Sequence, residues 1–302
     1  MSILAAPIVA ATAALPLASS TIITAYQNIT LPTTNTTLLG NIYNHWIYLG
    51  NDTYDLTRSM IAPTTKPVTI PMTGSRQRAI IEPSRSALII IDMQNFFLHP
   101  ELTPSAEGGR KAVEPTLKMI DAFRRNGMPV LWTFWGLDGK DLRDLPPSDI
   151  AGFSSTKHSP TNSFGSDMGK LKDGTELGQM LMRGSWNARP YGPLYDAQIQ
   201  GVKNGTDHYF NKNRVSGMWG AQTPLGLWLE ENQITTLFFG GVNSDQCVYG
   251  TLLDAGFKGY DTVFVDDISA TISPEYAAQM VRYNSDLNGF VSNSSLIIPA
   301  LS

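Results

Sequence analysis

The sequence contains few of the cysteine and histidine residues on which disulfide-rich and metal-rich proteins depend. Its 302 residues include one cysteine, Cys247, and only four histidines. A single cysteine excludes an intramolecular disulfide and any Cys-rich zinc module. Four scattered histidines argue against a His-rich metal cage. The chain must therefore be held together by its apolar core and its hydrogen bonds.

Basic runs and long apolar runs are also missing. The 22 Lys and Arg are balanced by 26 Asp and Glu, for a net charge of −4, and no basic stripe is present. This balance argues against a nucleic-acid partner. No apolar stretch reaches the length of a membrane span, apart from a Pro-interrupted one at Leu4–Ala18. We therefore expect neither nucleic acid nor membrane as a partner.

With 42% hydrophobic and 10% aromatic residues, the chain can build a sizeable core.

The first 51 residues contain no Asp, Glu, Lys or Arg at all. The apolar stretch inside this region has the length of a signal-peptide core, and Ala14 and Ala18 are the small residues that a signal peptidase prefers. No basic residue precedes it, because the first one is Arg58. Two interpretations stay open: a cleaved signal at about residues 1–19, or a low-complexity extension. The protein is accordingly either cytoplasmic or secreted.

Residues 20–76 are rich in Thr, Asn and Pro with scattered aromatics, which is typical of an extended arm lying on a folded body or on a neighbouring subunit. We treat residues 1–76 as an N-terminal extension and residues 77–302 as the folded domain. Glycosylation sequons, which an exposed secreted segment would carry, occur at Asn28, Asn35, Asn51, Asn204 and Asn293.

From residue 77 onward, apolar strand patterns alternate with helical ones. Strands are expected at residues 86–91, 129–135, 208–211, 235–242, 261–266 and 289–291, and helices at 113–125, 225–231, 247–256 and 274–284. Alternation with fully apolar strands predicts an α/β fold: three layers, α-β-α, around a central, mostly parallel, Rossmann-like sheet of about six strands. The polar stretch 136–206 is too long for a connector and is interpreted as an insertion that walls or covers a site. No strand is followed by a dinucleotide-binding or P-loop glycine motif.

Three chemically capable residues follow the ends of predicted strands. Asp92 ends the first strand, Lys212 follows the third, and Cys247 lies five residues beyond the fourth. Because ligands bind outside the carboxyl ends of parallel strands, the three should converge at one edge of the sheet. Each alone has a structural explanation: a turn cap, a solvated lysine or a buried cysteine. Their coincidence favours a catalytic site.

The residue types suit nucleophilic catalysis. Cys247 opens a predicted helix, whose N-terminus, together with the Lys212 ammonium, is expected to lower the thiol pKa. Asp92 can accept the thiol proton as general base. The loop 240–247 would bring backbone N–H groups close to the reacting carbon, where they can stabilise an oxyanion.

The motifs Ile91-Asp92-Met93-Gln94-Asn95, Asn211-Lys212-Asn213-Arg214 and the segment 241–248, Gly-Val-Asn-Ser-Asp-Gln-Cys-Val, together resemble the isochorismatase-like cysteine hydrolases. The resemblance covers residues 77–302. It implies an Asp92–Lys212–Cys247 triad, a cis peptide bond at Val242–Asn243, and oxyanion donors at the N–H groups of Asn243 and Cys247. Residues 183–186 and 212–217 are most similar to the ureidoacrylate amidohydrolase branch. The extension and the insertion depart from that branch, so its substrate is not carried over.

The nicotinamidase branch of this family binds zinc through one Asp and two His near the triad. Here residues 133–138 contain no His, and only His99 lies near Asp92 in the sequence. We therefore predict no catalytic metal and no cofactor. The residues expected to line the substrate pocket, although core packing explains the aromatic ones equally well, are Gln94, Asn95, Phe97, Trp135, Trp186 and Trp219.

The sequence thus predicts a metal-independent cysteine hydrolase that cleaves a C–N bond of a small amide or ureido substrate through a thioester. One alternative is an isochorismatase proper, which cleaves an enol ether. A second is a secreted binding protein that keeps the scaffold without turnover; the intact triad argues against it. A small-molecule substrate and assembly into a homo-oligomer are expected.

Overall fold

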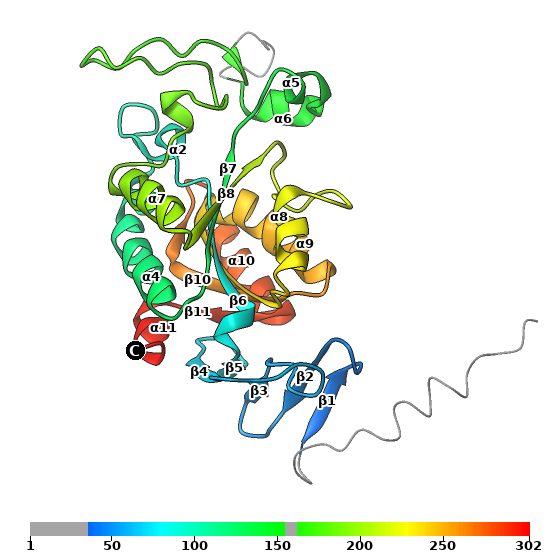
Figure 1. Cartoon of the computed structure of the whole chain (residues 1–302). Helices are drawn as coiled ribbons and strands as arrows, with labels where there is room; N and C mark the ends of the chain where they lie inside the picture. The colour runs from blue at the N-terminus through cyan, green and yellow to red at the C-terminus, as the bar shows by residue number, and fades with distance from the viewer. Residues whose placement is uncertain (1–35, 155–161) are drawn as a thin grey trace, which may run out of the picture.

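The computed structural model describes residues 36–154 and 162–302 and contains a six-stranded central sheet (Figure 1). Its strand order is β11-β10-β9-β6-β7-β8, and every neighbouring pair is parallel. The strands are β6 (Ser86–Ile91), β7 (Val130–Trp135), β8 (Asp207–Lys212), β9 (Thr236–Val242), β10 (Asp261–Ala270) and β11 (Phe290–Ser292). The predicted α/β fold with a parallel sheet of about six strands is confirmed.

Helices cover both faces of this sheet. In Figure 1, α4, α7 and α11 lie on one side of it and α8, α9 and α10 on the other. The helices are α2 (Asn95–Leu98), α3 (Glu107–Lys111), α4 (Val113–Arg125), α5 (Asp141–Asp144), α6 (Pro147–Gly152), α7 (Pro193–Asn204), α8 (Pro224–Glu231), α9 (Tyr249–Phe257), α10 (Glu275–Asn288) and α11 (Ser294–Ala300). Short turns of other helix types are η1 (Pro83–Arg85), η3 (Trp186–Ala188) and the π-helical η4 (Ser244–Val248).

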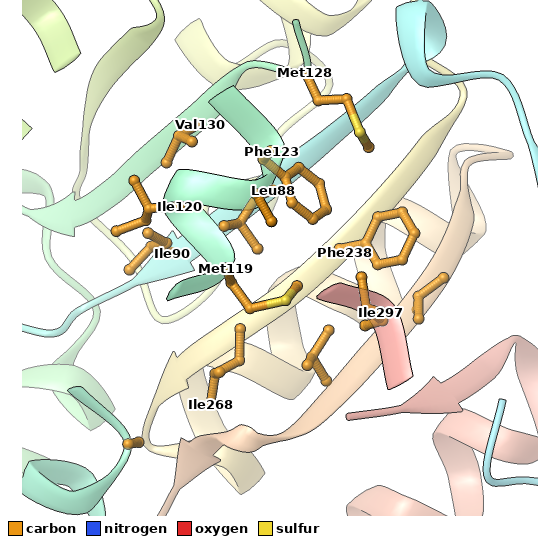
Figure 2. Packing of buried hydrophobic residues seen from close by; sticks show 14 of the residues in the cluster. Leu88, Ile90, Met119, Ile120, Phe123, Met128, Val130, Phe238, Ile268 and Ile297 are labelled. Carbon is orange, nitrogen blue, oxygen red and sulfur yellow. The ribbon is translucent and has the colours of Figure 1, made fainter. Parts of the chain in front are cut away.

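Two apolar cores fill the spaces between the layers. All six residues of β6 and of β7 are buried, as their apolar runs predict. Because successive side chains of a strand point to opposite faces, Leu88 and Ile90 pack toward α4 while Ile89 and Ile91 join the opposite core. Figure 2 shows the first core, where Phe123 of α4 faces Phe238 of β9 at a ring distance of 5.2 Å.

Besides the short helices α2, α3, α5 and α6, two longer helices were not predicted from the sequence. Residues 193–204 of the stretch interpreted as an insertion form α7, because β7 and β8 are parallel and their connection must cross over the sheet. α11 was not predicted; the Asn293 side chain caps it by accepting a hydrogen bond from the Leu296 N–H. The long connection before α7 otherwise carries only the short helices α5 and α6 and the turn η3 among its described residues.

From residue 37 onward, the segment expected to be an extended arm forms strands, and its aromatic residues pack on the folded domain as expected. Strands β1 (Thr37–Gly40), β2 (His45–Tyr48), β3 (Thr53–Asp55), β4 (Val68–Pro71) and β5 (Arg78–Ile81) form a second sheet in the order β1-β2-β3-β5-β4. The boundary expected at residue 76 falls between β4 and β5. The physical reason is aromatic packing: Trp46 and Tyr54 contact Phe290 of β11 with ring distances of 5.1 and 6.0 Å.

A buried ion pair attaches this small sheet to the amino ends of the central strands. The Arg58 guanidinium lies 2.6 Å from Asp261, the first residue of β10, and the two side chains are 3% and 2% exposed. Asp261 also accepts hydrogen bonds from the Trp46 indole at 2.6 Å and from the Thr236 hydroxyl at 3.0 Å. The two sheets are therefore joined by specific polar contacts as well as by packing.

The candidate signal peptide and the sequons at Asn28 and Asn35 lie outside the described residues. Asn51 and Asn204 are exposed, whereas Asn293 is half-buried at the start of α11. In the described ranges, no helix combines the length and the apolar character that a bilayer crossing requires.

Candidate active site

The topology brings the three predicted catalytic residues to the same edge of the sheet. Asp92 directly follows β6, Lys212 is the last residue of β8, and Cys247 lies in η4, which follows β9. β9 and β7 flank β6, and β8 is the next strand beyond β7. All three side chains therefore come from carboxyl ends of parallel strands, where ligands bind in open α/β sheets.

Lys212 lies between the other two residues. Its Nζ atom is 2.8 Å from Asp92 Oδ2 and 3.5 Å from Cys247 Sγ. The backbone N–H of Trp135 donates a hydrogen bond of 2.9 Å to Asp92 Oδ1 and fixes the carboxylate from its other side. A carboxylate, an ammonium and a thiol thus form one continuous chain of contacts.

Asp92 has an unusual backbone conformation. Its φ of 49° lies in the left-handed region, which costs a residue with a side chain about 1–3 kcal/mol. Its carbonyl accepts a hydrogen bond of 2.7 Å from the Gln94 N–H. Such strain persists only where surrounding contacts hold it, and it turns the carboxylate out of the strand toward Lys212.

The site is buried, and burial decides its protonation. Asp92, Lys212 and Cys247 are 0%, 4% and 3% exposed. Burial raises the pKa of the Asp92 carboxyl, and the Lys212 ammonium opposes that rise. Burial also raises the pKa of the Cys247 thiol to about 12, with Lys212 opposing and the Asp92 charge adding to the rise.

The expected low thiol pKa is therefore wrong. Lys212 does favour the thiolate, but the loss of water around sulfur outweighs its single charge. Nor does a regular α-helix begin at Cys247, because the residue lies inside the π-helical turn η4. At neutral pH the Cys247 thiol therefore keeps its proton in the resting site.

Trp135 contributes to the site in two ways. Besides its N–H contact with Asp92, its ring lies under the Lys212 ammonium, with Nζ 3.8 Å from the ring centroid. Gln94 holds Trp135 in place, because its Nε2 donates to the carbonyls of Trp135 and Ala188 at 2.8 and 2.7 Å. Gln94 is fully buried, so its observed role is to support the site.

The other predicted pocket residues differ in how they contact the site. Asn95, the first residue of α2, donates to the carbonyl of Trp186 at 2.9 Å, so these two residues lie together. Phe97 packs edge-on against Phe96 and Phe153 at ring distances of 4.9 and 6.3 Å, and Phe153 in turn packs on Trp135. Trp219 is 51% exposed, so it does not belong to the buried aromatic residues around Trp135. It lines a small cavity of about 120 Å³, which Lys212 also borders.

Sequence reasoning missed two aromatic residues from the long connection after β7. Phe153 and Phe164 pack on Trp135 with ring distances of 5.3 and 4.9 Å, and on each other at 4.3 Å. Two phenylalanines in a connection rich in Gly, Ser and Asp were the available signal, because aromatic side chains in a loop need a surface to cover. That surface is the Trp135 side of the triad.

The loop before Cys247 depends on close backbone packing. The peptide bond at Val242–Asn243 is cis, where the family resemblance places one. The Asn243 carbonyl accepts from the N–H groups of Gln246 and Val248 at 3.1 and 3.2 Å. A Cβ atom at Gly241 would lie 1.9 Å from the Ile91 carbonyl oxygen, so only glycine fits between β9 and β6 at this point.

Metal-ligand chemistry finds little support at this edge. Across residues 36–154 and 162–302, no three His, Cys, Asp or Glu side chains come together as a metal centre requires. Trp135 ends β7, and the two residues directly after this strand are Gly136 and Leu137, neither of which has a metal-binding side chain.

Comparisons with known proteins identify the family and the fold. The family model described as the isochorismatase domain matches residues 86–294, well over half of the chain. Nicotinamidase PncA from Bacillus subtilis is similar in structure with a TM-score of 0.53 and 24% identity, covering 69% of this chain and 99% of that one.

Two further structures share the fold. An isochorismatase family protein from Desulfovibrio vulgaris has a TM-score of 0.55 and 22% identity, covering 72% of this chain and 98% of that one. A cysteine hydrolase from Pseudomonas syringae has a TM-score of 0.55 and 18% identity, covering 78% and 97%. At these identities the likeness shows the fold alone, and the family rests on the match over residues 86–294. The chain belongs to the isochorismatase family of hydrolases.

Proposed function

We propose that this protein is a metal-independent cysteine hydrolase that cleaves the C–N bond of a small amide or ureido substrate through a thioester. The observation that supports it most strongly is the position of Lys212 Nζ, 2.8 Å from the Asp92 carboxylate and 3.5 Å from the Cys247 sulfur. A nucleophile, a base and a charge that binds both are the parts that acyl transfer requires.

In the first half-reaction the Cys247 sulfur attacks the substrate carbonyl carbon while the thiol proton passes to Asp92. Since the resting thiol is neutral, the base must act as the S–C bond forms, and the raised pKa of Asp92 increases its affinity for that proton. We assign stabilisation of the oxyanion to the N–H groups of Asn243 and Cys247. The C–N bond then breaks, and Asp92 returns the proton to the departing amine or ammonia.

In the second half-reaction water cleaves the thioester. Asp92 takes a proton from the water as its oxygen attacks the same carbonyl carbon, and the C–S bond breaks. The proton on Asp92 then restores the Cys247 thiol, and a carboxylic or carbamic acid leaves. Lys212 keeps its charge throughout and stabilises whichever of its two partners is anionic.

Two other functions compete with this proposal. Enol ether cleavage, as in an isochorismatase proper, does not need a thiol nucleophile, so Cys247 in contact with Lys212 favours C–N cleavage. A binding protein without turnover has no use for a strained, buried Asp92. The similarity of residues 183–186 and 212–217 to the ureidoacrylate amidohydrolase branch stays a prediction about the branch, and that branch's substrate is not carried over.

A substrate panel tests the proposal. The purified full-length chain is incubated with small linear amides, carbamoyl compounds and isochorismate, and ammonia or amine release is followed beside pyruvate release. We expect amine release that survives prolonged chelation and is lost in Cys247→Ala. Pyruvate release from isochorismate alone, activity that chelation abolishes and zinc restores, or full activity in Cys247→Ala would each contradict it.

A further inference from the structure

Helix α10 exposes four large apolar side chains on one face. Tyr276, Met280, Tyr283 and Leu287 are 71%, 39%, 70% and 58% exposed, and we call them the α10 stripe. Their spacing of four, three and four residues places them in one row along the helix. This spacing is the one found at seams where two helices pack together.

The α10 stripe is not needed to hold the helix on its own domain. α10 contacts β10 and β11, and its buried residues are Val281 and Ser285, on the opposite face. A surface helix normally presents polar residues to water on that outer side. An exposed row of large apolar residues on a surface helix therefore marks a site for a partner.

We propose that the α10 stripe is covered by the same stripe of a second copy of this chain, with the two helices antiparallel about a two-fold axis. With the axis between Met280 and Tyr283, each Met280 faces the partner's Tyr283, and each Tyr276 faces the partner's Leu287. Every large side chain then meets another large apolar one. A two-fold interface requires this self-complementarity.

The charges of α10 select the antiparallel arrangement. About this axis Glu275 faces Asn288 of the other copy, and Asp286 faces Ala277, so no like charges meet. A parallel arrangement would place Glu275 beside Glu275 and Asp286 beside Asp286. Arg282 is already paired with Asp266 at 2.9 Å and Glu275 at 3.2 Å in its own chain and places no unpaired charge in the seam.

A groove continues the apolar surface beyond the end of α10. It has a volume of about 320 Å³, and its lining includes Asn288 at the end of α10 and Phe257, which is 79% exposed. In the two-fold arrangement the partner's N-terminal end of α10, with Ile272 at 51% exposure before it, extends past Asn288 toward this groove. The groove of each copy thus receives the other's helix start.

The exposed area is of the order that a stable dimer needs. Tyr276, Tyr283 and Phe257 are each at least 70% exposed. Aromatic side chains bury about 150–250 Å² each when fully covered, so these three supply about half of the roughly 800 Å² per partner of a standard interface. The aliphatic members of the α10 stripe, Ile272 and the groove contribute to the remainder.

Replacing two residues of the α10 stripe by opposite charges tests whether this surface forms the dimer and whether the two helices are antiparallel. Sedimentation velocity of the full-length chain between about 1 and 100 µM should show a dimer that dissociates on dilution. Tyr276→Lys places a buried charge against Leu287, and Leu287→Glu places one against Tyr276, so each single variant should be monomeric. The double variant Tyr276→Lys/Leu287→Glu should recover the dimer, because each lysine then meets a glutamate.

The matched control is Ile199→Lys, which changes a residue of α7 with 46% exposure on the other side of the sheet and should leave the dimer intact. Melting curves confirm that all variants fold. A monomer at every concentration would overturn the proposal, and so would a dimer that both single variants leave unchanged. Failure of the double variant to restore the dimer would overturn the antiparallel pairing.

Discussion

Two buried ion pairs lie at opposite ends of the central sheet, and they differ in what surrounds them. Asp92 and Lys212 meet at the carboxyl ends of the strands, while Asp261 and Arg58 meet at the amino ends. All four side chains are nearly inaccessible to water, at 3% exposure or less. Burial alone therefore does not distinguish them.

The two ion pairs differ in the groups that hydrogen-bond to them. Arg58 donates to the Asn44 side chain and the Leu56 carbonyl, and Asp261 accepts from Trp46 and Thr236 besides Arg58. A buried pair whose other polar positions are filled holds two parts of a fold in register. Asp92 accepts from the Trp135 N–H and from Lys212, Lys212 also donates to the Arg214 carbonyl at 3.1 Å, and both charged groups contact the Cys247 thiol.

The comparison separates two uses of the same interaction. The pair at the amino ends is saturated with hydrogen bonds and has no nucleophile next to it, so its loss should affect folding. The pair at the carboxyl ends keeps capacity to take up and release a proton, so its loss should affect turnover. The predictions below test this division.

The largest effect should come from the catalytic pair. Asp92→Asn keeps the shape of the side chain but removes the base, and Lys212→Met keeps most of the stem but removes the charge. Each should lower kcat by about 10²–10⁴-fold, the usual cost of losing a general base. Because both act on the same proton transfer, the double variant should be little worse than the less active single variant. Full addition of the two losses in steady-state kinetics would show that they act separately.

Loss of the Arg58–Asp261 pair should lower stability and leave turnover nearly unchanged. Arg58→Met leaves the Asp261 charge buried without its partner, which typically costs about 3–5 kcal/mol of stability. Chemical denaturation should report this loss, while kcat per folded molecule stays close to that of the wild type. A large loss of kcat in Arg58→Met at a temperature where it is folded would contradict the division between the two pairs.

A smaller effect is expected at Trp135. Trp135→Leu removes the aromatic face beneath the Lys212 ammonium, and a cation–π contact is worth about 0.5–2 kcal/mol, which corresponds to roughly 2–30-fold in kcat/KM. Trp132→Leu is the matched control, because Trp132 is equally buried in β7 but packs in the other core. Equal kinetic losses in the two variants would show that only packing matters.

The smallest change concerns the resting thiol. Since the folded pKa of Cys247 is raised to about 12, the reactive thiolate is scarcer at neutral pH than in a free cysteine. The rate of alkylation by iodoacetamide should rise between about pH 6 and pH 10 without reaching a plateau. A plateau near neutral pH would mean that Lys212 outweighs burial and that the thiolate exists before the substrate binds.

The central sheet and the convergence of the catalytic residues could be predicted from the sequence. The runs at residues 86–91 and 235–242 predict buried parallel strands because both faces of such strands must be apolar. Once the strands are parallel, Asp92 and Lys212 must come to the same edge. Local pattern was therefore enough to predict which side chains meet.

What could not be predicted depends on contacts that are distant in the sequence. The small sheet of residues 37–81 forms because Trp46 and Tyr54 find Phe290, more than 200 residues away. The thiol pKa depends on how completely the three catalytic residues are enclosed, which helix position alone does not reveal. The packing of Phe153 and Phe164 on Trp135 likewise depends on where a long connection folds back.

The most direct test of the central claim is capture of the acyl group from Cys247. Hydroxylamine attacks thioesters faster than water does, so turnover of an accepted amide in its presence should yield the hydroxamate at the expense of the acid. Amine release should continue, and both products should vanish in Cys247→Ala. Turnover that gives only the acid at every hydroxylamine concentration and persists in Cys247→Ala would contradict the thioester and the role given to the Asp92–Lys212–Cys247 site.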